Sequence, residues 1–156
     1  MSEPKKLAII ATKGTLDWAY PPFILGSTAA ALGYDVQIFF TFYGLQLLRK
    51  NLNLQVSSLG NPAMPMPMPV PVLMQALPGM QAFMSSMMKS TMKKKGVASV
   101  EELRELCQEA DVKMIACQMT VDLFEFNTAD FIDGIEYGGA ATFFEFAGES
   151  DICLYV

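Results

Sequence analysis

The 156-residue sequence contains no histidine. This absence excludes Ser-His-Asp and Cys-His catalytic arrangements, metal sites built on histidine ligands, and an imidazole proton shuttle near neutral pH. Any general base must be a carboxylate, a lysine or a tyrosine. The chain also lacks the G-x-G-x-x-G and P-loop patterns that hold nucleotide phosphates. The sequence therefore predicts no bound cofactor.

Cysteine is scarce, with three residues in the chain. An odd number cannot pair completely, and residues 1–6 lead directly into a strand-like segment without the pattern of a signal peptide. We therefore expect a cytoplasmic protein whose thiols stay reduced and serve chemistry or apolar packing rather than crosslinking.

Charge is also sparse, since 17% of the residues are charged and the formal net charge is −5. This balance disfavours non-specific binding to nucleic acid. Residues 1–100 contain nine Lys/Arg and three Asp/Glu, whereas residues 101–156 contain two and thirteen. We interpret the acidic excess of the C-terminal part as the solvated surface of its helices.

An uncharged segment covers residues 51–88, and nine of the twelve methionines lie between Met64 and Met92. The prolines within Asn61–Pro71 exclude a helix or a central strand, so we expect a loop or an extended arm there. The repeated prolines also exclude an ordinary membrane span. Residues 73–95 fit packing against a core or another subunit, or peripheral contact with an anionic membrane.

Apolar runs rich in β-branched residues predict short strands, most of them buried on both faces. The predicted strands are Lys6–Thr12, Tyr34–Thr41, Leu52–Ser58, Val112–Ala116 and Asp151–Val156.

Helices are predicted between most of these strands from proline, glycine and capping signals. Ser99 and Glu102 form a capping box that starts one of them. The other helices are expected from Pro21-Pro22 to Leu32, over Gly44–Lys50, Met80–Lys94 and Thr120–Phe126, and from Gly138-Gly139 to Ala147. Alternating strands and helices predict a three-layer α/β sandwich with a central parallel sheet of about five strands and helices on both faces. We expect one domain over residues 1–156, with a Met/Pro-rich insert at about 60–95.

Reactive groups of an open parallel sheet gather where its strands end, because loops and helix N-termini meet there. Three loops meet this condition: residues 12–14, 41–44 and 117–120. Cys117 lies between a strand and a helix, where unpaired backbone amides lower a thiol pKa. It is the candidate nucleophile, although an ordinary buried thiol fits the same spacing, and Asp122 and Glu125 oppose a thiolate.

The other cysteines have simpler interpretations. Cys107 shares a helix face with Leu103 and Ala110 and is expected in the core. Cys153 lies in an apolar strand, where it is either buried or a second thiol that works with Cys117. Met64, Met66 and Met68 resemble a thioether site for Cu(I), but no histidine or cysteine completes it. We predict no metal site.

Four segments resemble the DsrE/DsrF-like family, and in particular its branch called peroxiredoxin-like. The resemblance extends over nearly the whole chain in the same order, and it includes the Met/Pro-rich insert. The segments are Lys13-Gly14-Thr15-Leu16-Asp17 with Tyr20-Pro21-Pro22, Phe39-Phe40-Thr41-Phe42-Tyr43-Gly44-Leu45, Ala116-Cys117-Gln118-Met119-Thr120-Val121-Asp122 and Ile135-Glu136-Tyr137-Gly138-Gly139-Ala140.

This resemblance implies an α/β domain that forms homo-oligomers and acts in sulfur trafficking. Relatives carry sulfur as a cysteine persulfide, and the matching positions here are Cys117 for the sulfur and Cys153 for a second cysteine. The resemblance assigns no role to Cys107. Its implied partners are sulfur donor and acceptor proteins or low-molecular-weight persulfides. The residues expected to bind substrate beside Cys117 are Lys13, Thr41, Tyr43 and Thr120.

Three functional hypotheses follow. The first is a sulfur carrier or sulfurtransferase, in which the Cys117 thiolate accepts sulfane sulfur and passes it to another thiol. Both a stoichiometric carrier and a catalyst fit these residues. The second is a non-catalytic oligomeric or membrane-docked scaffold that binds through the Met/Pro-rich arm. The third is thiol redox chemistry between Cys117 and Cys153, which requires their Cα atoms to lie within about 7 Å.

Overall fold

The computed structural model describes residues 2–57 and 72–156. Within these residues, five parallel strands form one sheet in the order β4-β3-β2-β1-β5. This confirms the predicted central parallel sheet. The strands are β1 (Lys6–Ala11), β2 (Asp35–Phe40), β3 (Lys113–Cys117), β4 (Glu136–Gly138) and β5 (Ile152–Tyr155).

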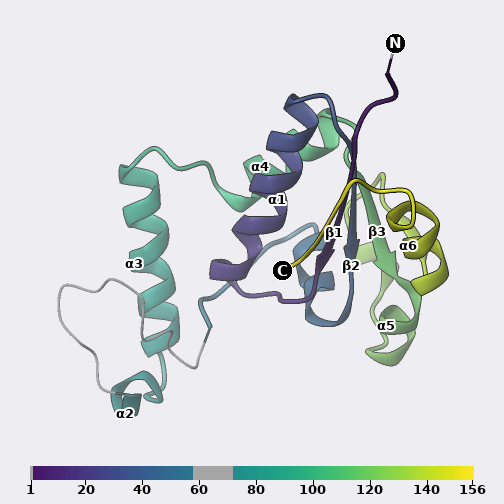
Figure 1. The fold of residues 1–156 in the computed structure, drawn as a ribbon. Coiled ribbons are helices and arrows are strands. Elements are labelled where there is room, and N and C mark those ends of the chain that lie inside the picture. The colour runs from purple at the N-terminus through teal and green to yellow at the C-terminus, as the bar shows by residue number, and fades with distance from the viewer. Residues whose placement is uncertain (1, 58–71) are drawn as a thin grey trace.

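Helices cover both faces of the sheet, as Figure 1 shows. Helices α1 (Leu16–Ala31) and α4 (Val100–Glu109) lie on one face, and α6 (Ala140–Ala147) lies on the other. The three-layer α/β sandwich predicted from the sequence is therefore confirmed.

The two faces of the sheet bury very different amounts of side chain. The face under α1 and α4 forms the main core, in which Ile9, Ile38 and Phe40 pack against Phe23. The second cluster is small and consists of Ala8, Phe39, Ile115, Cys117 and Phe143. Cys117 thus belongs to the thinly covered side of the molecule.

The predicted strand over Leu52–Ser58 is wrong, because residues 52–57 are extended but pair with no strand. Their polar backbone groups are satisfied elsewhere. The Gln55 carbonyl accepts from the Leu16 amide at 2.8 Å, and the Val56 amide donates to the Ser85 hydroxyl at 2.9 Å. Side chains alternate along this segment as in a half-exposed strand, with Leu54 and Val56 buried. The N-terminus of α1 and the Ser85 side chain therefore form the hydrogen bonds that a neighbouring strand was expected to form.

The fifth strand is instead β4, which the sequence did not predict. It has three residues, two of them exposed, and lies beside the end of β3 with Gly138 opposite Cys117. Such a short and polar segment shows neither an apolar run nor alternation, so no strand pattern reveals it.

Helix α1 begins at Leu16 rather than at Pro21-Pro22, and both prolines lie inside it. Proline removes a helix hydrogen bond, so this placement costs stability. Burial of Leu16, Tyr20 and Phe23 offsets that cost and holds the first turns in place. The helix ends as predicted, with Gly33 in the left-handed region at φ +86°.

The remaining helices agree with the sequence to different degrees. The predicted helix over Gly44–Lys50 is a 3-10 helix, η1, over Phe42–Leu48, and the helix predicted from Thr120 is α5, over Gln118–Leu123. The Ser99 capping box is present, with hydrogen bonds of 3.2 and 2.7 Å to Glu102. The short elements α2 (Val72–Gln75) and η2 (Thr128–Asp130) were not predicted.

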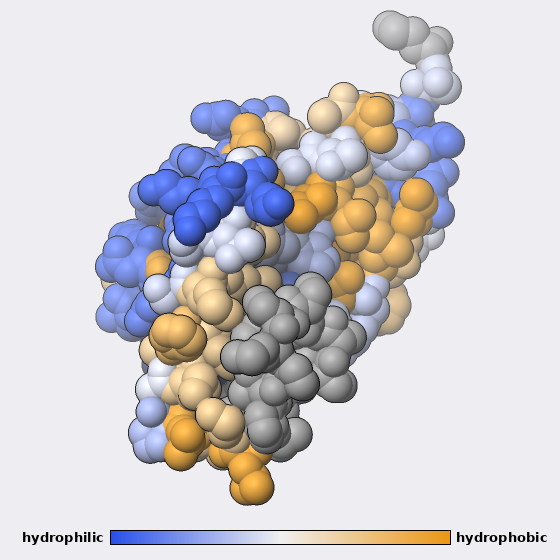
Figure 2. Space-filling model, turned by 90° about the vertical axis from the view of Figure 1, so that its left-hand side faces the viewer, coloured by the Kyte–Doolittle hydropathy of each residue, from blue (hydrophilic) through white to orange (hydrophobic). Residues whose placement is uncertain are grey.

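Helix α3 (Met80–Lys94) has the predicted bounds and lies outside the three layers (Figure 1). Its methionine stripe packs on the main core through Met80, Met84, Met88 and Met92. In Figure 2 hydrophobic residues lie at the bottom, near α2, and hydrophilic residues gather at the upper left. No helix among the described residues is both long and apolar enough to span a membrane. The Asn61–Pro71 arm lies outside the described residues.

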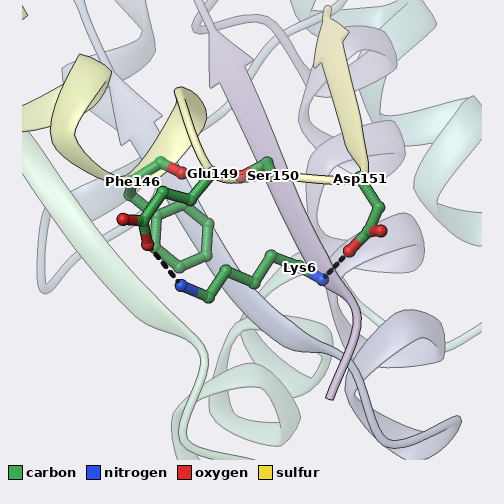
Figure 3. Close-up of polar contacts among 5 residues, drawn as sticks. All are labelled: Lys6, Phe146, Glu149, Ser150 and Asp151. Carbon is green, nitrogen blue, oxygen red and sulfur yellow. Dashed lines mark hydrogen bonds and ion pairs between the residues drawn. The ribbon is translucent and has the colours of Figure 1, made fainter. Parts of the chain in front are cut away.

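Lys6 fixes the start of the edge strand β5 (Figure 3). Its backbone amide donates to Asp151 at 2.8 Å, and its ammonium group lies 2.8 Å from Glu149 and 5.8 Å from the centre of the Phe146 ring. The ion pair is exposed and adds little stability. These contacts instead set the position of β5 beside β1.

Gly44 provides a test of the tight contact between η1 and β1. A Cβ atom there would meet the Ala11 carbonyl oxygen at 2.2 Å, whereas one at Gly139 would meet nothing within 4 Å. We expect Gly44→Ala to lower the free energy of unfolding by about 2–3 kcal/mol, because two backbones must move apart. Gly139→Ala is the control and should cost less than about 1 kcal/mol. Urea unfolding of both variants measures the difference, and equal effects would show that the two backbones separate easily.

Candidate functional site

The loops that follow β1, β2 and β3 meet at the carboxyl edge of the sheet, as the topology requires. The Thr41 amide donates to the Ala11 carbonyl at 3.0 Å, at the ends of β2 and β1. Gly14 and Gly44 allow the first two loops to touch, since a Cβ on Gly14 would lie 2.4 Å from the Tyr43 carbonyl oxygen. The predicted meeting point of these loops is therefore correct.

Cys117 is the last residue of β3 and the N-cap of α5. Its side chain is only 4% exposed, and that of Thr120, one turn further along, is fully buried. Thr41 from the neighbouring loop completes the group, with its hydroxyl oxygen 3.4 Å from that of Thr120. Three of the predicted site residues, Cys117, Thr41 and Thr120, are thus brought together.

The orientation of the Thr120 hydroxyl is set by the loop after β2. The Phe42 backbone amide donates to the Thr120 oxygen at 3.2 Å. Because that oxygen already accepts a hydrogen bond, its own proton is directed toward another acceptor. The Thr41 hydroxyl oxygen, at 3.4 Å, is one such acceptor, and hydrogen bonding by the Thr120 and Thr41 hydroxyls lowers the pKa of the Cys117 thiol.

The balance at the sulfur favours the thiolate. Burial raises the pKa of the Cys117 thiol, but hydrogen bonds lower it by more, so its pKa lies below the ordinary value. In decreasing order of effect, the donors are the Thr120 hydroxyl, the Thr120 amide, the Thr41 hydroxyl and the Met119 amide. The site can therefore hold a sulfur nucleophile without a histidine.

Two other predicted site residues lie in the adjoining loops but have different contacts. The Lys13 ammonium lies 3.3 Å from the centre of the Trp18 ring, an arrangement that a cation–π attraction stabilises. Tyr43 is exposed and stacks on Phe124, with ring centres 5.8 Å apart. Among the described residues, hydrogen bonds rather than a lysine lower the pKa of Cys117.

Cys153 is exposed and lies on β5, away from Cys117. The strands β2 and β1 separate β3 from β5, which amounts to about 14 Å across the sheet. The register aligns Cys153 with Ala8, Gln37 and Lys113, four residues before Cys117, which adds about 13 Å along the strands. An intramolecular disulfide needs Cα atoms within about 7 Å. The redox hypothesis for this pair is therefore wrong within one chain.

Cys107 is a core residue, as the sequence predicted. It is fully buried on α4, and its thiol donates to the Phe23 carbonyl at 3.4 Å. Burial raises the pKa of Cys107 to about 11, although a backbone hydrogen bond from Ser27 opposes the rise. This thiol remains protonated at neutral pH and cannot compete as a nucleophile.

Sequence reasoning missed the contribution of Phe42 and of the aromatic rings around it. Phe42 acts through its backbone amide, which carries no residue-specific signal, and Phe124 comes close only because two loops fold together. No cluster of three or more His, Cys, Asp or Glu side chains that could hold a metal is found in residues 2–57 and 72–156. Met64, Met66 and Met68 lie outside those residues.

Comparison with known proteins assigns the chain to a family. The model of the DsrE/DsrF/DrsH-like family matches residues 3–155. The chain belongs to this family. It is 76% identical to the sulfur carrier protein DsrE2 of Allochromatium vinosum over 158 aligned positions, which cover 99% of each chain. The resemblance inferred from the sequence is therefore confirmed.

Two further comparisons give more distant matches. The protein YrkE of Bacillus subtilis, described as uncharacterized, is 31% identical over 99% of this chain and 98% of its own. The crystal structure of the YchN protein of E. coli matches with a TM-score of 0.56 at 13% identity, covering 97% of this chain and 99% of that one. At that identity the match supports the fold alone.

The lowered pKa of Cys117 predicts how its alkylation depends on pH. The alkylation rate is proportional to the fraction of Cys117 present as thiolate. As the pH is lowered, this rate should therefore begin to fall at a lower pH than the rate for an ordinary cysteine, whose pKa is about 8.5. Thr120→Val removes the hydroxyl that lowers the pKa of Cys117 most. The pH at which the alkylation rate is half-maximal should therefore rise toward the pKa of an ordinary cysteine. The measurement is iodoacetamide alkylation of a Cys153→Ser protein, in which Cys107 remains protonated. An unchanged midpoint in Thr120→Val would contradict the assigned role of the hydroxyl.

Proposed function

We propose that the protein is a sulfur carrier that holds sulfane sulfur as a persulfide on Cys117 and passes it to an acceptor thiol. The observation that carries this proposal is the set of hydrogen bonds that lowers the pKa of Cys117 in a site without histidine. The name of the DsrE2 relative, at 76% identity, supports the same function.

Loading begins with the Cys117 thiolate. It attacks the outer sulfur of a donor persulfide, a new S–S bond forms to Cys117, and the S–S bond of the donor breaks. The donor leaves as a thiolate, and the transferred sulfur keeps its proton or releases it to water. The sulfur atom moves without a change in the number of thiols or S–S bonds, so no oxidant or reductant is consumed.

Unloading is the same reaction in reverse direction. An acceptor thiolate attacks the outer sulfur of the Cys117 persulfide, the S–S bond to Cys117 breaks, and the Cys117 thiolate is released. A thiol with a lowered pKa is a good leaving group, so the hydrogen bonds that favour loading also favour release.

Fixed hydrogen bonds suit this chemistry better than a titrating base would. The charge on sulfur appears and disappears during both steps, but the amides and hydroxyls of the site need not change protonation. Thr120 is fully buried and its oxygen accepts a hydrogen bond from the Phe42 amide, so the hydroxyl is held in place before the reaction starts. The donors are therefore preorganised for a thiolate.

Assembly and location belong to the same proposal. We expect a cytoplasmic homo-oligomer whose 73–95 segment contacts another subunit or a membrane surface. Exposed Leu73, Leu77 and Phe83 support such a contact, and the lysines at the end of α3 suit anionic headgroups. The transfer partners are donor and acceptor proteins or low-molecular-weight persulfides.

Sulfur loading and transfer can be measured by intact-protein mass spectrometry after incubation with glutathione persulfide. We expect one added sulfur atom on the wild type and on Cys153→Ser, and its loss when dithiothreitol is added. Cys117→Ser should load at least tenfold less, because Cys107 is buried with a pKa of about 11 and Cys153 lies on β5, away from the hydroxyls and amides of the site.

The matched Cys117→Ser and Cys153→Ser variants separate the hypotheses. A scaffold function predicts that neither substitution changes assembly and that the wild type takes up no sulfur. Equal loading of both variants would contradict the assignment of the sulfur to Cys117.

A further inference from the structure

Five exposed side chains lie beside the buried Cys117. They are between 41% and 64% exposed, and all are large and apolar or aromatic. We call them the apolar platform: Phe42, Tyr43, Met119, Leu123 and Phe124. They come from only two segments, the start of η1 and helix α5 with the residue after it.

The platform is continuous across these two segments. The Phe124 ring lies 6.2 Å from the Phe42 ring in an edge-on arrangement and 5.8 Å from the Tyr43 ring in a stacked one, measured between centres. Met119 and Leu123 are four residues apart on α5, so they share one face of the helix. Such a cluster costs free energy in water unless a partner covers it.

The platform and the thiol are parts of one structure. Phe42 follows Thr41, and its amide holds the Thr120 hydroxyl that donates to the sulfur. Met119 lies next to Thr120, and its own amide also donates to the sulfur. A partner seated on the platform would therefore lie against the two segments that surround Cys117.

The charges beside the platform select among partners. Asp122 and Glu125 are exposed and flank Leu123 and Phe124 in the chain. Persulfides of small thiols, polysulfides and thiosulfate are anions, so these carboxylates slow their approach. A protein surface with lysines or arginines is attracted to the same place.

We propose, building on the sulfur-carrier function, that the apolar platform docks a protein partner whose sulfur-exchanging cysteine lies between apolar side chains flanked by Lys or Arg. The apolar residues of the partner cover Leu123 and the Phe124 ring, and its cations face Asp122 and Glu125. Its thiolate then attacks the outer sulfur of the Cys117 persulfide, an S–S bond forms to the partner, and the Cys117 thiolate is released.

Two synthetic peptides test this docking, Lys-Lys-Leu-Cys-Leu-Lys-Lys and Glu-Glu-Leu-Cys-Leu-Glu-Glu. The persulfide-loaded protein is mixed with each peptide, and the rate of sulfur transfer is followed by mass spectrometry. 2-Mercaptoethanol, a small neutral thiol, reports the reactivity of the persulfide itself. We expect the basic peptide to accept sulfur at least tenfold faster than the acidic one, and we expect added salt to reduce the ratio.

Substitutions on the platform identify the surface. Leu123→Gln should slow transfer to the basic peptide about fivefold or more, and the double variant Asp122→Asn with Glu125→Gln should reduce the preference between the peptides. Leu106→Gln on α4 is the matched control, since Leu106 is also exposed, at 48%, and should leave both rates unchanged. Transfer to 2-mercaptoethanol should stay the same in all these variants.

The outcomes separate the docking proposal from the proposed function. Equal rates for the two peptides, or a Leu123→Gln rate equal to that of Leu106→Gln, would overturn the docking proposal while sulfur carriage stands. A wild-type protein that takes up no sulfur from glutathione persulfide would overturn both.

Discussion

The hydrogen bond from the Phe42 amide to the Thr120 hydroxyl joins the loop after β2 to the helix after β3. It holds in place the hydroxyl that contributes most to lowering the pKa of Cys117. The same bond holds Phe42 in the left-handed region at φ +48°, a conformation that costs free energy for a bulky residue. The reactive thiol and the aromatic surface beside it therefore depend on one contact between two loops.

The two buried cysteines show how strongly placement controls this chemistry. Cys107 lies in the main core, where burial raises its pKa to about 11. Cys117 is nearly as buried, but it lies at a strand end where hydrogen bonding by two hydroxyls and two amides lowers its pKa. On the thinly covered side of the sheet, exposed residues of η1 and α5 border the carboxyl edge near Cys117. The thickly covered side provides the stability that holds that edge in place.

Much of this arrangement was predictable from residue patterns. The parallel sheet, the bounds of α3, the Ser99 capping box, the core role of Cys107 and the position of Cys117 after a strand all follow from local signals. The strand prediction for Leu52–Ser58 was wrong because alternating side chains indicate which residues are buried. They do not indicate which groups form hydrogen bonds with the backbone of the segment. Strand β4 and the Phe42 amide were missed because their roles come from backbone geometry, which side-chain patterns do not encode. The separation of Cys117 from Cys153 depended on the strand order, which needed the structure.

The central claim is that one thiol, Cys117, carries the sulfur. The most direct measurement is to load the wild-type protein with glutathione persulfide, alkylate it, digest it and find by tandem mass spectrometry which cysteine holds the additional sulfur atom. The account predicts that the peptide containing Cys117 carries it, because that thiol has a lowered pKa and lies at the carboxyl edge. Sulfur found mainly on Cys153 or Cys107 would contradict the account.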